Sequence, residues 1–131
     1  MRKFIFCILL CLPLAAFAEE IVSPQEFKEI SEGKTLYFTR NGQLFGIEQY
    51  YKRHRSTWQF ADGECDDGVW YPDGDYICFQ YTKNPDEQCW TFLKTDKGYV
   101  ARAEGAGPEF DLYLHSVDQK PLDCKAPDTG V

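Results

Sequence analysis

The sequence has 131 residues, of which 21 are acidic and 14 are basic, giving a formal net charge of −7. This acidic balance argues against nucleic-acid binding and against docking on anionic lipid. The length fits a single domain.

The first residues are typical of a secretory signal peptide. Arg2 and Lys3 precede the apolar run 4–12, and Ala16-Phe17-Ala18 places small residues where a signal peptidase cuts. The apolar run is shorter than the roughly 20 residues that span a bilayer, and no later segment could span one. We therefore expect a signal peptide at 1–18, a single β-rich domain at 19–131, and a periplasmic or secreted location. Cleavage would leave 113 residues with a net charge of −9, because two basic residues are lost.

A short helix is predicted at the start of the expected domain. Ser23 suits the N-cap, Pro24 the first helical position, and Glu26 would complete a capping box with Ser23. Phe27 would pack against Val22 as a hydrophobic staple, and Gly33 would end the helix. So short a helix needs tertiary contacts to be stable.

A β-hairpin is predicted next. The runs 34–40 and 43–51 flank Asn41-Gly42, a dipeptide that favours a two-residue type I′ turn. Such a turn would set four apolar residues on one face in two opposed pairs, Phe38 with Phe45 and Leu36 with Ile47.

Six further strands are expected at regular spacing, separated by Gly, Pro, Asn and Asp turns. They are 56–61, 65–71, 75–82, 88–94, 98–104 and 109–116. Eight short strands joined by tight turns favour an all-β fold, a small eight-stranded up-and-down barrel or a strongly curved antiparallel meander, with the short N-terminal helix. The alternative is an open curved sheet or a two-layer sandwich. Closure is favoured because it removes exposed edges. With 16% aromatic residues, we expect the interior to be mostly filled.

Four cysteines remain outside the expected signal peptide, which predicts two disulfides with three possible connectivities. They are Cys65, Cys78, Cys89 and Cys124. A four-residue loop 82–85 would place Cys78 opposite Cys89, which leaves Cys65 to bind Cys124. There is no Cys-x-x-Cys pair and there are only two histidines, so we expect no metal site and no cofactor.

The central stretch 62–70, Asp-Gly-Glu-Cys-Asp-Asp-Gly-Val-Trp, continues through 77–81 and Cys89-Trp90 to 122–124. It resembles a family of small, exported, uncharacterised proteobacterial proteins that share Asp-Gly, Gly-x-Trp and paired-cysteine motifs. The resemblance implies a periplasmic or secreted β-rich protein and no particular activity. Gly68-Val69-Trp70 is also similar to the motif whose Trp plugs lipocalin and avidin barrels, although in lipocalins it lies on the first strand.

One basic cluster interrupts the acidic sequence and is the first candidate for a partner-binding surface, since basic side chains beside aromatic rings suit an anionic group. The candidate residues are Tyr51, Lys52, Arg53, His54, Arg55 and Trp58. An ordinary solvated turn is the alternative.

Acidic residues crowd two of the expected turns, namely Asp62, Glu64, Asp66, Asp67, Asp73 and Asp75. Clustered carboxylates could bind calcium, but Asp67 stands where an EF-hand loop needs glycine, so solvated turns are favoured. Paired carboxylates could also cleave glycosides, yet a filled barrel offers no cleft.

The sequence therefore predicts a non-enzymatic exported envelope protein that binds a partner or small ligand. One alternative is an inhibitor of a cell-wall-degrading enzyme such as a lysozyme, whose basic surface would suit the acidic chain. Another is a lipocalin-like carrier of a small apolar ligand, which requires an internal cavity. A small hydrolase would require two carboxylates facing each other across a cleft.

Overall fold

A computed structural model describes residues 8, 10–13 and 18–125. Most of the predicted signal peptide lies outside these residues. In the described part of the chain, no helix is both long and apolar enough to cross a membrane.

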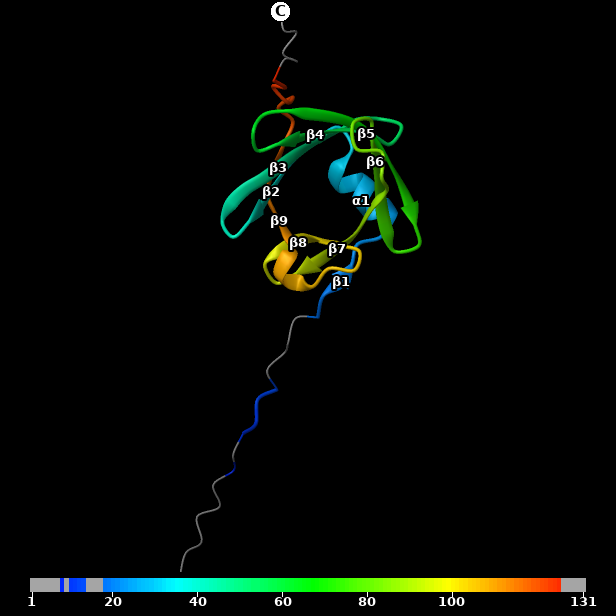
Figure 1. The fold of residues 1–131 in the computed structure, drawn as a ribbon. Helices are drawn as coiled ribbons and strands as arrows, with labels where there is room; N and C mark the ends of the chain where they lie inside the picture. Colours follow the sequence, from blue (N-terminus) through cyan, green and yellow to red (C-terminus); the bar gives the residue numbers. More distant parts are fainter. Residues whose placement is uncertain (1–7, 9, 14–17, 126–131) are drawn as a thin grey trace, which may run out of the picture.

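Nine antiparallel strands form one sheet that closes on itself (Figure 1). The strands are β1 (Glu20–Ile21), β2 (Thr35–Arg40), β3 (Gln43–Tyr50), β4 (Arg55–Phe60), β5 (Cys65–Asp73), β6 (Tyr76–Tyr81), β7 (Gln88–Thr95), β8 (Gly98–Ala103) and β9 (Leu112–Asp118). The helix α1 (Pro24–Ser31) lies between β1 and β2, and a 3-10 turn, η1 (Pro108–Phe110), precedes β9.

Strands β2 to β9 follow each other around an eight-stranded barrel, and β9 pairs with β2 to close it. The predicted up-and-down barrel is therefore confirmed, and the open sheet and the sandwich are wrong. The two-residue strand β1 was not predicted. It pairs with the second half of β7, through Leu93 and Lys94, beyond the residues at which β7 pairs with β6.

The predicted helix is confirmed, and it closes one end of the barrel. The Ser23 hydroxyl accepts a hydrogen bond of 3.1 Å from the backbone N–H of Glu26, and Gly33 follows the helix with a φ of 74°. The Glu26 carboxylate turns to Lys94, 2.9 Å away, so the second half of the predicted capping box does not form. Phe27, on the inner face of α1, is 1% exposed. It packs edge-on against Tyr50 and Trp70.

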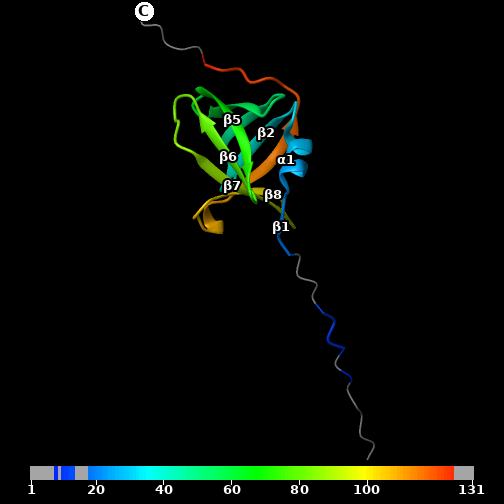
Figure 2. The same ribbon diagram turned by 90° about the vertical axis from the view of Figure 1, so that its right-hand side faces the viewer.

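We call the end covered by α1 the closed end and the opposite end the mouth. The side view in Figure 2 places α1 at one end and the β6–β7 loop at the other. Because the strands run up and down, the loops β2–β3, β4–β5, β6–β7 and β8–β9 surround the mouth. Trp70 lies at the closed end, where its ring packs edge-on against Phe27.

The predicted hairpin turn is confirmed, but the predicted strand register is wrong. Asn41 and Gly42 have φ angles of 51° and 74°, the left-handed pair that a type I′ turn needs. The register then shifts, because Thr39 pairs with Leu44 whereas Phe38 pairs with Gly46. Phe45 is the extra residue of a β-bulge. Beyond it Leu36 faces Glu48, where the regular hairpin would have placed Ile47.

Both predicted disulfides are confirmed. Cys78 pairs with Cys89 across β6 and β7, and Cys65 binds Cys124 in the segment after β9. The second bond holds the C-terminal segment beside the β4–β5 turn, where the Lys125 N–H donates to the Gly63 carbonyl. Two disulfides are compatible with the expected periplasmic or extracellular location.

Candidate ligand-binding pocket

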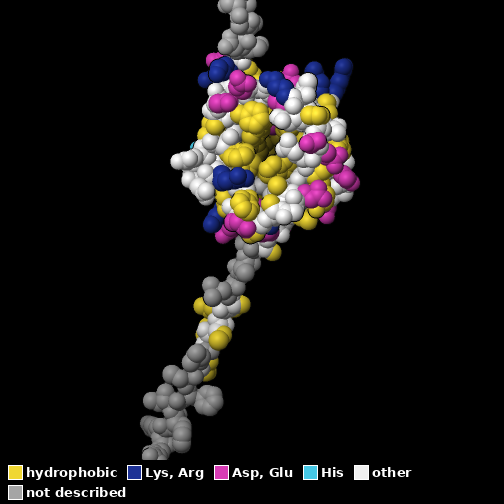
Figure 3. Space-filling view, in the orientation of Figure 1, with side chains coloured by type: hydrophobic (Ala, Val, Ile, Leu, Met, Phe, Trp, Pro, Cys, Tyr) yellow, Lys and Arg dark blue, Asp and Glu magenta, His cyan; other side chains and the backbone are white. Residues whose placement is uncertain are grey.

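The barrel encloses a pocket of about 320 Å³ that opens at the mouth. Figure 3 looks into this opening and shows it lined with hydrophobic side chains. The expectation of a mostly filled interior is therefore wrong for this half, because α1 and Phe27 fill only the closed end. The lining residues are Phe38, Phe45, Glu48, Tyr50, Trp58, Phe60, Asp66, Phe79, Tyr81, Asn84, Gln88, Trp90, Phe92, Ala101 and Leu112.

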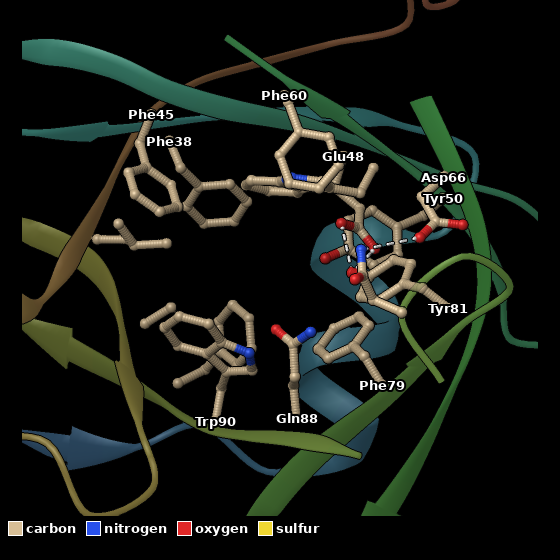
Figure 4. Close-up of a pocket in the computed structure, with 15 residues that line it drawn as sticks. Phe38, Phe45, Glu48, Tyr50, Phe60, Asp66, Phe79, Tyr81, Gln88 and Trp90 are labelled. Carbon is tan, nitrogen blue, oxygen red and sulfur yellow. Dashed lines mark hydrogen bonds between the residues drawn. The ribbon is translucent and has the colours of Figure 1, made fainter. Parts of the chain in front are cut away.

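Aromatic rings form most of the pocket wall and extend to its rim (Figure 4). The centroid of the Trp58 ring lies 6.0 Å from that of Phe45 and 6.2 Å from that of Phe60. These two phenylalanines remain 38% and 41% exposed although they line the pocket. Large apolar side chains that stay exposed around an opening are typical of binding sites.

Two glycines with side-chain positions facing inward make room for these rings. A Cβ at Gly46 would lie 2.0 Å from Trp58 Cζ2, and one at Gly68 would lie 2.6 Å from Tyr81 Cδ1. Real Cβ atoms do not approach other atoms so closely, so both positions require glycine for the rings to lie flat on the wall. Gly68 thus positions Tyr81 in the pocket.

The bulge at Phe45 brings a carboxylate into the barrel. Residues three apart on a regular strand point to opposite faces, yet Phe45 and Glu48 both line the pocket. Glu48 pairs with Trp58, which pairs in turn with Asp66. Two acidic side chains therefore flank Trp58 in one row across β3, β4 and β5.

The Glu48 carboxylate is 2% exposed and is held by one phenol. The Tyr81 hydroxyl lies 2.8 Å from both Oε1 and Oε2 and donates its one proton in a hydrogen bond shared between them. Burial, together with the negative charge of Asp66, raises the pKa of Glu48 from its usual 4.5 to about 8. At neutral pH the proton is therefore retained in much of the empty protein.

Asp66, also 2% exposed, is fixed by the β6–β7 loop. Its Oδ1 accepts a hydrogen bond of 2.9 Å from the backbone N–H of Lys83, and its Oδ2 accepts one of 3.5 Å from the Asn84 amide. The conformation of the β6–β7 loop thus depends on the Asp66 carboxylate inside the barrel.

The acidic and phenolic groups gather on one side of the pocket, whereas the Gln88 amide points into the cavity beside Trp90 (Figure 4). Figure 4 shows Glu48, Tyr50, Asp66 and Tyr81 together, across the cavity from Phe45. The lining contains these two carboxylates and no Lys, Arg or His. Such a pocket can hold an apolar molecule and contact one polar group of it.

The predicted partner-binding residues do not form one surface. Residues 51–54 join β3 to β4 at the closed end, where the His54 ring stacks on Trp70 at 3.8 Å between centroids. Arg55 lies over the Tyr51 ring at 5.9 Å. Trp58 instead lines the pocket inside the barrel. Arg53 and His54 have φ angles of 60° and 56°, so this is a tight, strained turn. A partner for the basic loop, including Lys52, stays a prediction.

The acidic turns do not gather into one cation site. Asp66 points into the barrel, whereas Asp67 accepts a 2.7 Å hydrogen bond from the Thr57 hydroxyl, and Asp62 accepts one from the Glu64 N–H. In the described part of the chain, the one cluster with metal-ligand spacing joins Glu87 to Cys78 and Cys89. Both sulfurs of that cluster are used in a disulfide.

The sequence did not predict that Glu48 lines the pocket, because the β2–β3 hairpin was assumed to be regular. One signal was available. Gly46 is an isolated glycine within a strand, and such glycines mark bulges and close approaches. It would have predicted the register shift that turns Glu48 inward.

Comparison with models of protein families, with curated proteins and with solved structures finds no match for this chain. The geometry of the pocket is therefore the guide to its function.

Proposed function

We propose that the protein is a non-enzymatic, exported binding protein that carries one small, largely apolar ligand in the open half of its barrel. The observation that supports this is the aromatic pocket of about 320 Å³ at the mouth. Pockets from about 300 Å³ upward, lined mainly by apolar side chains with a few polar groups, are typical of small-molecule sites.

The closed end supports a carrier because it gives the pocket a floor. Phe27, Tyr50 and Phe92 pack together at that end, so a ligand would enter and leave through the mouth alone. The disulfides and the closed sheet stiffen the wall, which lowers the entropy lost on binding.

A dye-binding assay tests the proposal. N-phenyl-1-naphthylamine, a neutral aromatic dye that fluoresces in apolar sites, should bind with a stoichiometry of one. Ala101 is buried in the pocket wall, where it pairs with Phe92 on the neighbouring strand. Ala101→Phe should therefore fill the cavity and abolish dye binding. Ala61→Phe adds the same ring to an exposed turn and should leave dye binding unchanged.

The stability of Ala101→Phe is measured by urea unfolding, and Ala101→Leu serves if the larger ring prevents folding. Unchanged dye affinity in a folded Ala101 variant would refute the pocket as the binding site. Native mass spectrometry of protein purified from its own compartment would show the mass of a bound ligand.

Once native mass spectrometry has identified the ligand, a further step distinguishes a carrier from a hydrolase. Glu48 and Asp66 both line the cavity but lie on the same side of it (Figure 4), so catalysis is tested directly by incubating the identified ligand with the protein. A carrier returns it chemically unchanged, whereas conversion would replace this proposal with an enzymatic one.

A further inference from the structure

The pocket contains acidic groups that no basic side chain balances. Glu48 and Asp66 are almost fully buried, and none of the lining residues is Lys, Arg or His. Buried carboxylates are usually paired with a cation, because isolated negative charge in an apolar site is costly. A bound ligand is the partner that could supply the positive charge.

Two basic side chains lie near the mouth, but both are engaged elsewhere. The Lys83 ammonium, on the β6–β7 loop, donates a 2.7 Å hydrogen bond to the Cys65 carbonyl. The Arg40 guanidinium lies 4.5 Å from the centroid of the Phe45 ring and donates a 2.7 Å hydrogen bond to the Phe110 carbonyl. Neither Arg40 nor Lys83 is part of the lining. Neither forms an ion pair with Glu48 or Asp66 in the described part of the chain.

The aromatic wall favours the same kind of ligand. The faces of Trp, Tyr and Phe rings carry negative electrostatic potential and attract cations within about 6 Å. Trp58 stands between Glu48 and Asp66 in the strand register. Ring faces and carboxylates thus surround one region of the pocket, which is the arrangement that recognises an ammonium group.

We infer that the ligand is an organic cation, an amine or quaternary ammonium with an apolar body, whose charged head lies against Glu48 and Asp66. This rests on the proposed function and adds the chemical class of ligand. The apolar body would contact the rings at the rim, where Phe45 and Phe60 are partly exposed.

The groups that face Glu48 decide how binding depends on pH. None of these groups is basic. They are Tyr50 on the same strand, Ser56 and Trp58 on β4, Asp66 on β5 and Tyr81 on β6. A cation beside Glu48 favours the ionised carboxylate, so binding should release a proton. Affinity should rise about tenfold per pH unit up to about pH 8 and level off above it.

Two probes that differ only in charge test the inference. Benzyltrimethylammonium carries a quaternary nitrogen where neopentylbenzene carries a carbon, and each competes with N-phenyl-1-naphthylamine. At pH 8.5 the cation should bind the wild-type protein at least tenfold more tightly than its neutral counterpart. Its affinity should fall with decreasing pH, while that of neopentylbenzene stays constant.

Variants locate the charge. Glu48→Gln keeps the shape of the side chain and should weaken the cation at least tenfold, with less than a twofold change for neopentylbenzene. Glu64→Gln removes an equal charge from an exposed turn and should change neither affinity. If Glu48→Gln does not fold, Asp66→Asn provides the same comparison, and the pH profile of the wild type needs no variant.

Equal affinity for the two probes would overturn the inference and leave the proposed function intact, provided that the dye still binds and Ala101→Phe still abolishes its binding. Absence of dye binding in the wild-type protein would instead refute the proposed function. A cation preference that survives in both Glu48→Gln and Asp66→Asn would place the cation elsewhere and also overturn the inference.

Discussion

The closed end and the mouth of this barrel are built from the same strands, yet one is packed and the other is hollow. At the closed end Phe27 enters from α1, and its ring centroid lies 4.5 to 5.5 Å from those of Tyr50, Trp70 and Phe92. At the mouth the wall is equally aromatic, but no element enters the space between Phe45, Trp58 and Phe60.

The difference shows that aromatic content does not decide whether a small barrel is filled. An eight-stranded barrel is just wide enough either to be filled by its own side chains or to hold one small ligand, so the same wall is compatible with both. Here one eight-residue helix closes one end with Phe27 beneath it, and the other end stays open.

The largest expected effect breaks the packed end. Phe27→Ala should lower the free energy of unfolding by about 3–5 kcal/mol, because it leaves a cavity among aromatic rings. Urea unfolding followed by circular dichroism measures this. Phe110→Ala, at a side chain that is 53% exposed, should change it by less than about 0.5 kcal/mol. Equal losses in the two variants would show that α1 does not plug the barrel.

The disulfides have the next largest expected effect. One of them, Cys65–Cys124, lies beside the mouth at the β4–β5 turn. Cys65–Cys124 closes a chain segment of 59 residues, and Cys78–Cys89 closes one of 11. From loop entropy, replacing the first pair by serine should cost about 4 kcal/mol and the second about 3 kcal/mol. Urea unfolding of the two double-serine variants checks the order, and the reverse order would contradict the entropic account.

Glu48 makes the hollow end sensitive to pH. Between pH 4.5 and about 8, Glu48 keeps its proton in the folded protein and has lost it in the unfolded chain. The contribution of Glu48 to the free energy of unfolding should therefore be fully present below pH 4.5. It should fall as the pH rises, by at most about 1.4 kcal/mol per pH unit. Urea unfolding from pH 5 to 8 should show that Glu48→Gln becomes increasingly stable relative to the wild type. Parallel profiles for the two proteins would show that Glu48 titrates normally.

The smallest expected effect concerns the wall of the mouth. Gly46→Ala should force the Trp58 ring into the cavity, which costs about 1–3 kcal/mol and weakens dye binding. The reason is the 2.0 Å approach between the added Cβ and Trp58 Cζ2. In a Trp58→Ala background the same change should cost little, so a double-mutant cycle measures the coupling. Additive effects would mean that Gly46 does not accommodate the ring.

The fold was largely predictable because its signals are local. Ser23 and Pro24 predict where the helix begins, and Asn41-Gly42 predicts the turn. The strand spacing predicts the meander, and the register of β6 and β7 predicts the Cys78–Cys89 disulfide. The pocket was less predictable, because it depends on which residues face inward around the whole barrel. A single extra residue, Phe45, exchanges the inward-facing and outward-facing positions along the rest of β3.

The sequence by itself determined β2 to β9, the turns and the Cys78–Cys89 pair, since each follows from residues that are neighbours along the chain or across one hairpin. The Cys65–Cys124 pair then followed by elimination. Only the tertiary structure decided that the mouth is hollow and that Glu48 and Asp66 lie inside it. Those outcomes depend on the distance between opposite walls of the closed sheet and on where α1 stops, and no local pattern of side chains contains either quantity.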